Sequence, residues 1–190
     1  MHISEGILSG PVLLTGAALA AAGTAVGLKK LDYDRIAQTG ILSAAFFVAS
    51  LIHVPVGPTS VHLILNGIVG LLLGWCAFPA ILIALLLQGL FFQFGGITTL
   101  GVNTLIMALP AVICYYLFSP FIVNKNTSAM IAAFLCGFLC VFLSAVIMGA
   151  SLVFSEENFL EISALVIVAH LPVMVIEGVI TAFCIVFLKK

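Results

Sequence analysis

Charged residues are the scarcest class in this chain of 190 residues. Asp, Glu, Lys and Arg together make up 7% of the sequence, whereas 64% is hydrophobic and the mean hydropathy is +1.38. A water-soluble domain carries about 25% charged and about 45–50% apolar residues. So few charges cannot cover a water-facing surface, which excludes soluble enzymes and nucleic-acid-binding proteins. The composition predicts an all-α integral membrane protein with a single membrane domain over residues 1–190.

Several motifs of membrane enzymes and channels are also missing. The sequence has no Walker A motif (G-x-x-x-x-G-K-[ST]), so any ATP hydrolysis would require another protein. It has neither the His-Glu-x-x-His pattern of an intramembrane metalloprotease nor a charged ring for a pore. Its five cysteines lie within apolar runs, which favours packing over a disulfide framework, although Cys136 and Cys140 are spaced to bind a soft metal.

Long apolar runs account for most of the chain. One membrane crossing takes about 20 apolar residues, and polar interruptions divide the sequence into seven runs. The predicted spans are Leu8–Leu28, Ile36–Val54, Val61–Ala77, Pro79–Phe92, Thr104–Val123, Ala129–Phe154 and Ser163–Leu188. Only Phe78 and Pro79 mark the division between the third and fourth runs, so a chain with six spans is the alternative.

The six basic residues distinguish these two topologies. Lys and Arg near the ends of spans stay on the cytoplasmic side of the membrane. With seven spans, all of them fall on one side: they are Lys29, Lys30, Arg35, Lys125, Lys189 and Lys190. With six spans they would be divided between the two sides. We therefore expect seven transmembrane helices, with the N-terminus outside and the C-terminus in the cytoplasm.

The first two residues form a possible metal chelate on the outer side. The Met1 amine, the backbone nitrogen of His2 and its imidazole Nδ1 would close fused five- and six-membered rings around one ion. A fourth nitrogen would complete a square-planar set, which Ni(II) and Cu(II) favour. His53 and His62, in the loop between the second and third spans, lie on the same side. The alternative is that Met-His is merely the way this chain begins.

Three separated motifs resemble the CbiM/NikM family. They are Met1-His2-Ile3-Ser4-Glu5-Gly6, the stretch HVPVGPTSVHL at positions 53–63 and the stretch FGGITTLGVNT at positions 94–104. The similarity extends to the last span at Ala169-His170-Leu171-Pro172 and Ile176-Glu177-Gly178. The chain is thus similar to the substrate-binding subunits of energy-coupling-factor transporters for cobalt and nickel, and most of all to the cobalt branch.

The resemblance implies a set of metal ligands. In the family, the metal is held by the Met1 amine, by the backbone and imidazole nitrogens of His2, and by a loop histidine that corresponds to His62. Residues just outside the ligands would orient them or supply hydrogen bonds; these are His53, Asn66, Thr98, Thr99 and Asn103. The loop with Gly95, Gly96, Gly101 and Asn103 would form a lid over the pocket.

The resemblance also implies partners, a location and a function. The family works in the cytoplasmic membrane of prokaryotes with a CbiQ-like transmembrane coupling subunit, CbiO-like cytoplasmic ATPases and a small companion, CbiN. The implied function is high-affinity uptake of divalent cobalt for cobalamin synthesis by a subunit that is not itself an enzyme. Co2+ or Ni2+ would be the transported substrate, with no organic cofactor. Because planar nitrogen coordination suits Ni(II) better than Co(II), a nickel-specific subunit is the alternative.

Two ionisable residues of the last span are not explained by this ligand set. His170 and Glu177 are seven residues apart and therefore lie on about the same helix face. Glu177 falls near the middle of the membrane, where a charge is costly. A metal relay or a sensor of subunit contact is one interpretation. The favoured one is a hydrogen bond from protonated Glu177 to a Ser, Thr or His of another helix.

Small residues line one face of two predicted helices. They are Gly16, Ala17, Ala20, Gly23 and Gly27 in the first, and Gly67, Gly70 and Gly74 in the third. Such stripes allow helices to approach closely in lipid. The sequence leaves open whether they pack within this chain or against the coupling subunit.

Overall fold

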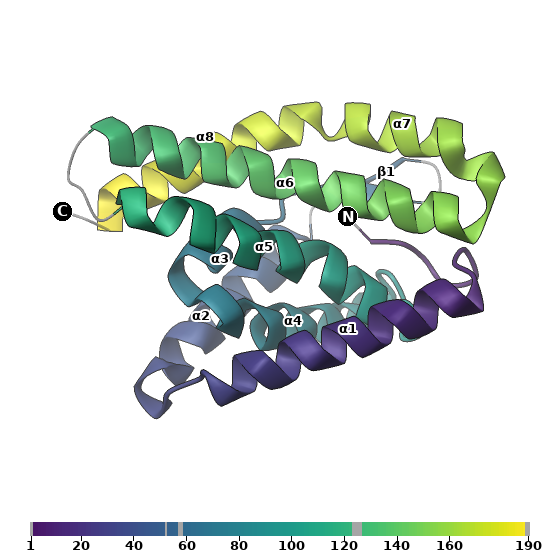
Figure 1. The fold of residues 1–190 in the computed structure, drawn as a ribbon, viewed down its shortest axis with the longest axis horizontal. Helices are drawn as coiled ribbons and strands as arrows, with labels where there is room; N and C mark the ends of the chain where they lie inside the picture. Colours follow the sequence, from purple (N-terminus) through teal and green to yellow (C-terminus); the bar gives the residue numbers. More distant parts are fainter. Residues whose placement is uncertain (1, 52, 57–58, 123–126, 189–190) are drawn as a thin grey trace.

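Helices run in both directions along one long axis in the computed structural model, which describes residues 2–51, 53–56, 59–122 and 127–188 (Figure 1). The first part comprises α1 (Gly10–Lys29), the 3-10 turn η1 (Tyr33–Arg35), α2 (Ile36–Ala49), β1 (His53–Val56) and β2 (Thr59–His62). Then follow α3 (Asn66–Leu73), η2 (Gly74–Cys76), α4 (Ala77–Phe92), α5 (Leu100–Ile122), α6 (Thr127–Ser155), η3 (Glu157–Phe159), α7 (Leu160–Ala169) and α8 (Leu171–Leu188).

Large apolar side chains cover the outside of the bundle. Leu14, Phe154 and Phe183 are 74%, 80% and 72% exposed. Five stretches of the described chain are long and apolar enough to cross a bilayer: Gly10–Lys29, Asn66–Phe92, Leu100–Ile122, Ser128–Ser155 and Leu160–Leu188. An apolar exterior around helices that satisfy their own backbone groups suits lipid and not water. The chain is therefore a membrane protein with several apolar helices.

The stretch from Asn66 to Phe92 is not one straight helix. Gly74 has backbone angles of φ 56° and ψ −124°, which end α3 and begin the turn η2. Asn66 and Gln88 would be about 33 Å apart on a continuous helix. Instead, His62, four residues before Asn66, and Gln88 both lie against the imidazole of His2, at 3.0 and 2.8 Å from its two nitrogens. The chain therefore reverses at Gly74–Cys76, shortly before the boundary that the sequence predicted at Phe78 and Pro79, both of which lie in α4.

Two short antiparallel strands lie where the sequence predicted the end of one span and the beginning of the next. β1 pairs with β2, and His53 lies opposite His62 and Val56 opposite Thr59. The predicted helix Ile36–Val54 therefore ends early, at Ala49, and the predicted helix Val61–Ala77 begins late, at Asn66. The physical reason is that proline at position 55 and the β-branched residues around it favour extended backbone, although the stretch is as apolar as a helix.

The last predicted span, Ser163–Leu188, consists of two helices. α7 ends at Ala169 and α8 begins at Leu171, with His170 between them. Pro172 has no N–H to donate to the carbonyl four residues earlier, which interrupts the helical hydrogen bonding at this point. The remaining predicted spans differ from α1, α4, α5 and α6 by a few residues at their ends.

The small residues of α1 and α3 pack inside the chain. A Cβ at Gly23 would lie 2.5 Å from the ring of Phe78, and one at Gly16 would lie 2.4 Å from Val102. On α3, a Cβ at Gly70 would lie 2.3 Å from the carbonyl oxygen of Ala111. These glycines therefore allow close approach to α4 and α5, and the stripe is internal packing at these positions.

The segment before α1 turns back into the bundle. Figure 1 shows it running from the start of α1 to a position between α1 and α6. His2 and Ile3 are buried there, at 4% and 0% exposure. The N-terminal residues thus meet the β hairpin and the ends of α4 and α5 inside the protein.

We expect Gly70→Ala to destabilise the bundle, because its new methyl group would overlap the Ala111 carbonyl. Such overpacking costs about 1–3 kcal/mol. Gly40→Ala on the exposed face of α2 is the matched control, since a Cβ there meets nothing within 4 Å. Thermal unfolding of both variants in detergent, followed by circular dichroism, should give a lower midpoint for Gly70→Ala alone. Equal midpoints would contradict the packing argument.

Candidate metal centre

The imidazoles of His2 and His62 lie in direct contact inside the protein. His2 Nδ1 is 3.0 Å from His62 Nε2, and the two ring centroids are 4.7 Å apart. The side chains are only 4% and 3% exposed. His2 comes from the N-terminal segment and His62 from the end of β2, so the fold joins two residues 60 positions apart in the sequence.

The outer nitrogen of each ring is held by a hydrogen-bond acceptor. His62 Nδ1 donates to the carbonyl oxygen of Leu63 at 2.7 Å, because a carbonyl can only accept. His2 Nε2 donates to Gln88 Oε1 at 2.8 Å. The orientation of the Gln88 amide follows from its Nε2, which donates to the carbonyl of Phe47 at 3.4 Å and to the hydroxyl of Ser50. Both rings therefore have a defined tautomer.

With the outer nitrogens protonated, the inner nitrogens of both neutral rings present lone pairs to each other. Burial lowers the pKa of His62 well below its ordinary value, which favours the neutral ring at neutral pH. A neutral imidazole nitrogen is the form that binds a metal ion. The pair is thus a ready-made set of two nitrogen donors for one cation.

The separation of the two inner nitrogens suits neighbouring positions around a metal. Imidazole nitrogen binds such ions at about 2.0–2.1 Å, so two donors at a right angle are about 2.9 Å apart. The observed distance is 3.0 Å. Opposite corners of a square plane would place the donors about 4 Å apart by the same bond length. The arrangement therefore fits a cis pair of ligands.

Asn103 fixes the backbone next to His2. Its Oδ1 accepts from the N–H of Ile3 at 2.9 Å, and its Nδ2 donates to the carbonyl of Ile3 at 3.1 Å. The same Nδ2 donates to Thr99 Oγ1 at 3.2 Å. The side chain of Asn103 thus pairs with both polar groups of one residue, as a neighbouring strand would, and holds the N-terminal segment in place.

The loop at residues 93–99 packs against the N-terminal segment. Glu5 Oε1 accepts from the backbone N–H of Thr98 at 3.1 Å and from its hydroxyl at 3.4 Å. Gly95 has φ +77°, and a Cβ there would lie 2.9 Å from the Asn103 amide. Thr98 therefore contacts Glu5 directly. Gly101 and Asn103, both expected in this loop, lie instead in α5, where Gly101 packs against Ala17.

Asn66 lies four residues after His62 in the sequence, at the start of α3. Its Nδ2 donates to the carbonyl of Met107 at 3.2 Å and to Ser144 Oγ at 3.0 Å, and it is fully buried. It therefore joins α3 to α5 and α6. Met1 lies outside the described residues, and His53 is described only through its backbone pairing with His62.

Glu177 has a different partner from the one that the sequence favoured. Its Oε1 accepts from the backbone N–H groups of Ile64 and Leu65, and not from a Ser, Thr or His side chain. His170 donates from Nδ1 to the carbonyl of Val166 at 2.7 Å, within its own helix turn. The favoured interpretation of Glu177 is therefore wrong as to its partner.

Gln88 is the residue that sequence reasoning missed. It is fully buried in α4 and holds the ring of His2. A signal was present, because Gln88 is the only polar side chain in the run Pro79–Phe92. A polar side chain within an apolar span is a candidate functional residue.

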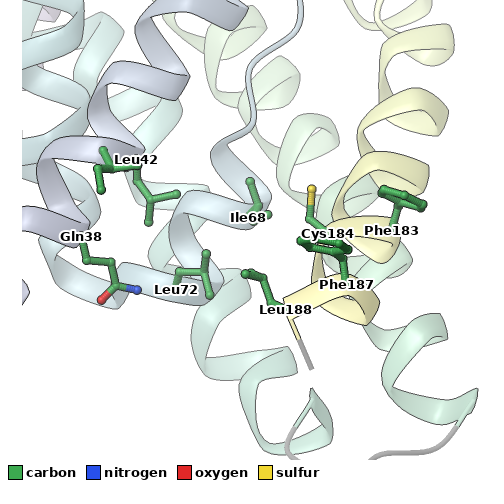
Figure 2. Close-up of a pocket in the computed structure, with 9 residues that line it drawn as sticks. Gln38, Leu42, Ile68, Leu72, Phe183, Cys184, Phe187 and Leu188 are labelled. Carbon is green, nitrogen blue, oxygen red and sulfur yellow. The ribbon is translucent and has the colours of Figure 1, made fainter. Parts of the chain in front are cut away.

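An apolar cavity lies away from the histidines and differs from their site in chemistry. It has a volume of about 650 Å³ and lies between α2, α3 and α8 (Figure 2). Leu42, Ile68, Leu72 and Phe187 are among its lining residues, and Gln38 provides the amide group seen at its edge. An apolar hollow of this kind offers a divalent cation no set of donors.

Comparison with known proteins also points to metal ions. Residues 2–190 match the family model CbiM, described as the cobalt uptake substrate-specific transmembrane region. A protein of Haemophilus influenzae, whose assignment to metal transport is provisional, is 46% identical over 195 residues, which cover 100% of this chain and 94% of the relative. The cobalt transport protein CbiM of Sorangium cellulosum is 27% identical over 205 residues, covering 100% and 91%.

A nickel protein is also among the relatives. The fused nickel transport protein NikMN of Rhodobacter capsulatus is 39% identical over 115 residues, which are 57% of this chain and 33% of the relative. The crystal structure of a transition metal transporter matches with a TM-score of 0.78 at 26% identity, covering 100% of this chain and 93% of the other. Since the family model spans residues 2–190, this chain belongs to the CbiM family of cobalt uptake proteins.

Proposed function

We propose that this protein binds divalent cobalt from outside the cell as the substrate-specific subunit of an energy-coupling-factor transporter, with nickel as the alternative substrate. The observation that carries the proposal is the 3.0 Å contact between His2 Nδ1 and His62 Nε2, with both outer nitrogens held by acceptors. Family membership supports cobalt or nickel uptake as the general activity.

The proposed ligands are the Met1 amine, the backbone nitrogen and Nδ1 of His2, and Nε2 of His62. A chelate of three consecutive nitrogens occupies three corners of a square plane, and Nδ1 is at one end of it. The fourth corner is therefore a neighbour of Nδ1. The cis spacing of the His2 and His62 nitrogens agrees with that placement.

The surrounding hydrogen bonds would hold this set in its binding geometry. Gln88 orients the His2 ring, and Asn103, supported by Thr99, positions the backbone of Ile3. Glu5 and Thr98 tie the loop at residues 93–99 to the same segment, so that loop would act as the lid. We assign His53 and Asn66 to the support of the loop that carries His62. Such outer partners fix tautomer and ring orientation at metal sites.

We also propose seven crossings of the cytoplasmic membrane, with the histidine pair at the outer end. Arg35 donates to the carbonyl of Leu72 at one end of α2, and Ser50 at the other end meets Gln88. α2 therefore extends from the reversal between α3 and α4 to the residues around the histidine pair. It would count as one of the seven crossings, although it has only 14 residues. Lys29 and Lys30 lie at the end of α1 opposite the site, which agrees with a cytoplasmic location for that end.

As a transport subunit, the chain would depend on other proteins for energy. We propose a CbiQ-like coupling subunit, CbiO-like ATPases and the small companion CbiN, in a prokaryotic inner membrane. The cobalt taken up would serve cobalamin synthesis. This chain would perform no reaction of its own, consistent with relatives whose names describe transport.

Inserting one leucine between Met1 and His2 should abolish binding of Co(II) and Ni(II), because it separates the amine from the chelate rings; a bulky residue at this position keeps Met1 in place. Isothermal titration of the purified protein and uptake of radioactive cobalt by cells measure the effect. A leucine inserted between Asp32 and Tyr33, both exposed at the far end of the bundle, is the control and should leave binding intact. Unchanged binding after the first insertion would refute the proposed ligand set.

Gln88→Leu should weaken metal binding roughly tenfold to hundredfold, the usual effect of removing an outer partner of a ligating histidine. The leucine cannot accept from His2 Nε2, so the ring loses its fixed tautomer. Gln38→Leu is the matched control, since Gln38 is exposed on α2. If both variants bind nickel equally well in titrations, Gln88 has no part in the site.

If the protein prefers cobalt, it should retain more cobalt than nickel after incubation with equal concentrations of Co(II) and Ni(II). Elemental analysis after removal of unbound metal gives the ratio directly. An excess of nickel would favour the alternative, since planar nitrogen donors suit Ni(II). Replacing His62 by Ala should lower the content of both metals, which shows that the ratio reports on this site.

A further inference from the structure

We propose that Glu177 is a positioning residue for His62: its carboxylate holds the peptide group that in turn holds the imidazole. The inference deepens the proposed function, because it assumes that His62 is a metal ligand. It rests on hydrogen bonds that join α8 to the segment between β2 and α3. No side chain of this segment takes part in them.

One peptide group connects the carboxylate to the histidine. The carbonyl of Leu63 accepts from His62 Nδ1 at 2.7 Å. The N–H of the same peptide belongs to Ile64 and donates to Glu177 Oε1 at 2.5 Å. The peptide is therefore held at both ends, by the imidazole on one side and by the carboxylate on the other.

A second hydrogen bond fixes the segment further. The N–H of Leu65 donates to the same Oε1 at 2.8 Å. Leu65 has φ 56° and ψ 13°, a left-handed conformation that is uncommon for a residue with a branched side chain. The side chain of Leu65 makes no cap hydrogen bond to α3, and the second strand ends at His62. The two N–H groups thus use neither sheet nor helix, and Glu177 satisfies both.

The carboxylate is placed by a rigid part of the bundle. Glu177 is fully buried, and a Cβ at Gly137 of α6 would lie 2.5 Å from its backbone carbonyl. α6 and α8 therefore meet at backbone contact, which leaves Glu177 little freedom to shift. Within the described residues it forms no ion pair, so the two N–H groups are its partners for Oε1.

This arrangement explains how an apolar segment presents His62 in one orientation. Metal-binding histidines commonly donate their second N–H to a carboxylate or a carbonyl, which fixes the tautomer and raises ligand basicity. Here the carbonyl of Leu63 is the direct partner of His62, and Glu177 polarises the same peptide group through its N–H. Glu177 therefore acts on the metal through His62, and not as a ligand itself.

The tautomer of His62 in the metal-free protein tests the inference directly. In protein labelled with 15N-histidine, the NMR signals of His62 should show a proton on Nδ1. Glu177→Leu removes the acceptor and should produce a mixture of tautomers, whereas Glu177→Gln keeps an acceptor oxygen and should retain the wild-type signal. If Glu177→Leu leaves the His62 signals unchanged, the proposal is wrong. Because no metal is present, this result stands even if the wild-type protein binds neither cobalt nor nickel, which would refute only the proposed function.

Metal affinity provides the second readout. Glu177→Leu should weaken nickel binding roughly tenfold to hundredfold and shift the visible absorption of bound Ni(II), while Glu177→Gln should stay within about threefold of wild type. In a His62→Ala background, Glu177→Leu should cause no further loss. An equal loss in both backgrounds would show that Glu177 acts on overall packing instead.

Two further variants guard against a general folding defect. Thr181→Val removes another buried oxygen on the same helix, one that has no protein partner among the described residues, and should leave both readouts unchanged. Glu177→Asp keeps the carboxyl group but shortens the side chain, so it should also give a mixture of His62 tautomers. It replaces the leucine variant in the test if that variant fails to accumulate. A wild-type tautomer in the aspartate variant would overturn the proposal.

Discussion

The burial of two adjoining imidazoles is the constraint on which this end of the bundle depends. His2 and His62 belong to segments that contain few other polar groups, and both rings lie where water does not reach. A buried polar group without a hydrogen bond costs about 1–3 kcal/mol. Each outer nitrogen therefore requires a partner from the protein itself, and the positions of α4 and of the segment after β2 follow from that requirement.

A few polar side chains complete the site by hydrogen-bonding to backbone groups. Asn103 pairs with the N–H and carbonyl of Ile3, and Glu177 accepts from the N–H groups of two consecutive residues. A chain with 7% charged residues has few side chains to use for this purpose. Single amides and one carboxylate therefore each fix a stretch of main chain, which is how two short segments without helical hydrogen bonding remain ordered within the bundle.

The helices were predictable from the sequence because apolarity is the property that a membrane span requires, and the reversal near Phe78 was also marked. The ends of the spans were not predictable, since apolarity does not separate helix from strand, and His53–Val56 and Thr59–His62 form two paired strands. His2 and His62 were predicted as ligands from chelate chemistry and from motif position, and the structure brings their imidazoles together. Gln88 was missed, although a lone amide in an apolar run is a visible signal. The partner of Glu177 was unpredictable, because backbone N–H groups leave no pattern in a sequence.

Charge balance connects the metal proposed here to the one carboxylate buried beneath it. A divalent ion bound by two neutral imidazoles, a neutral amine and a deprotonated backbone nitrogen would leave a net charge of about +1 in a medium where an isolated charge is costly. An ionised Glu177 would supply the opposite charge, one peptide group away from His62. The two charges would then stabilise each other across a polarised peptide without direct coordination. A carboxylate bound to the ion itself would neutralise its charge more strongly. It would, however, replace a nitrogen of the planar set, and nitrogen ligands are what separate a site for Co(II) or Ni(II) from the oxygen sites of calcium and magnesium.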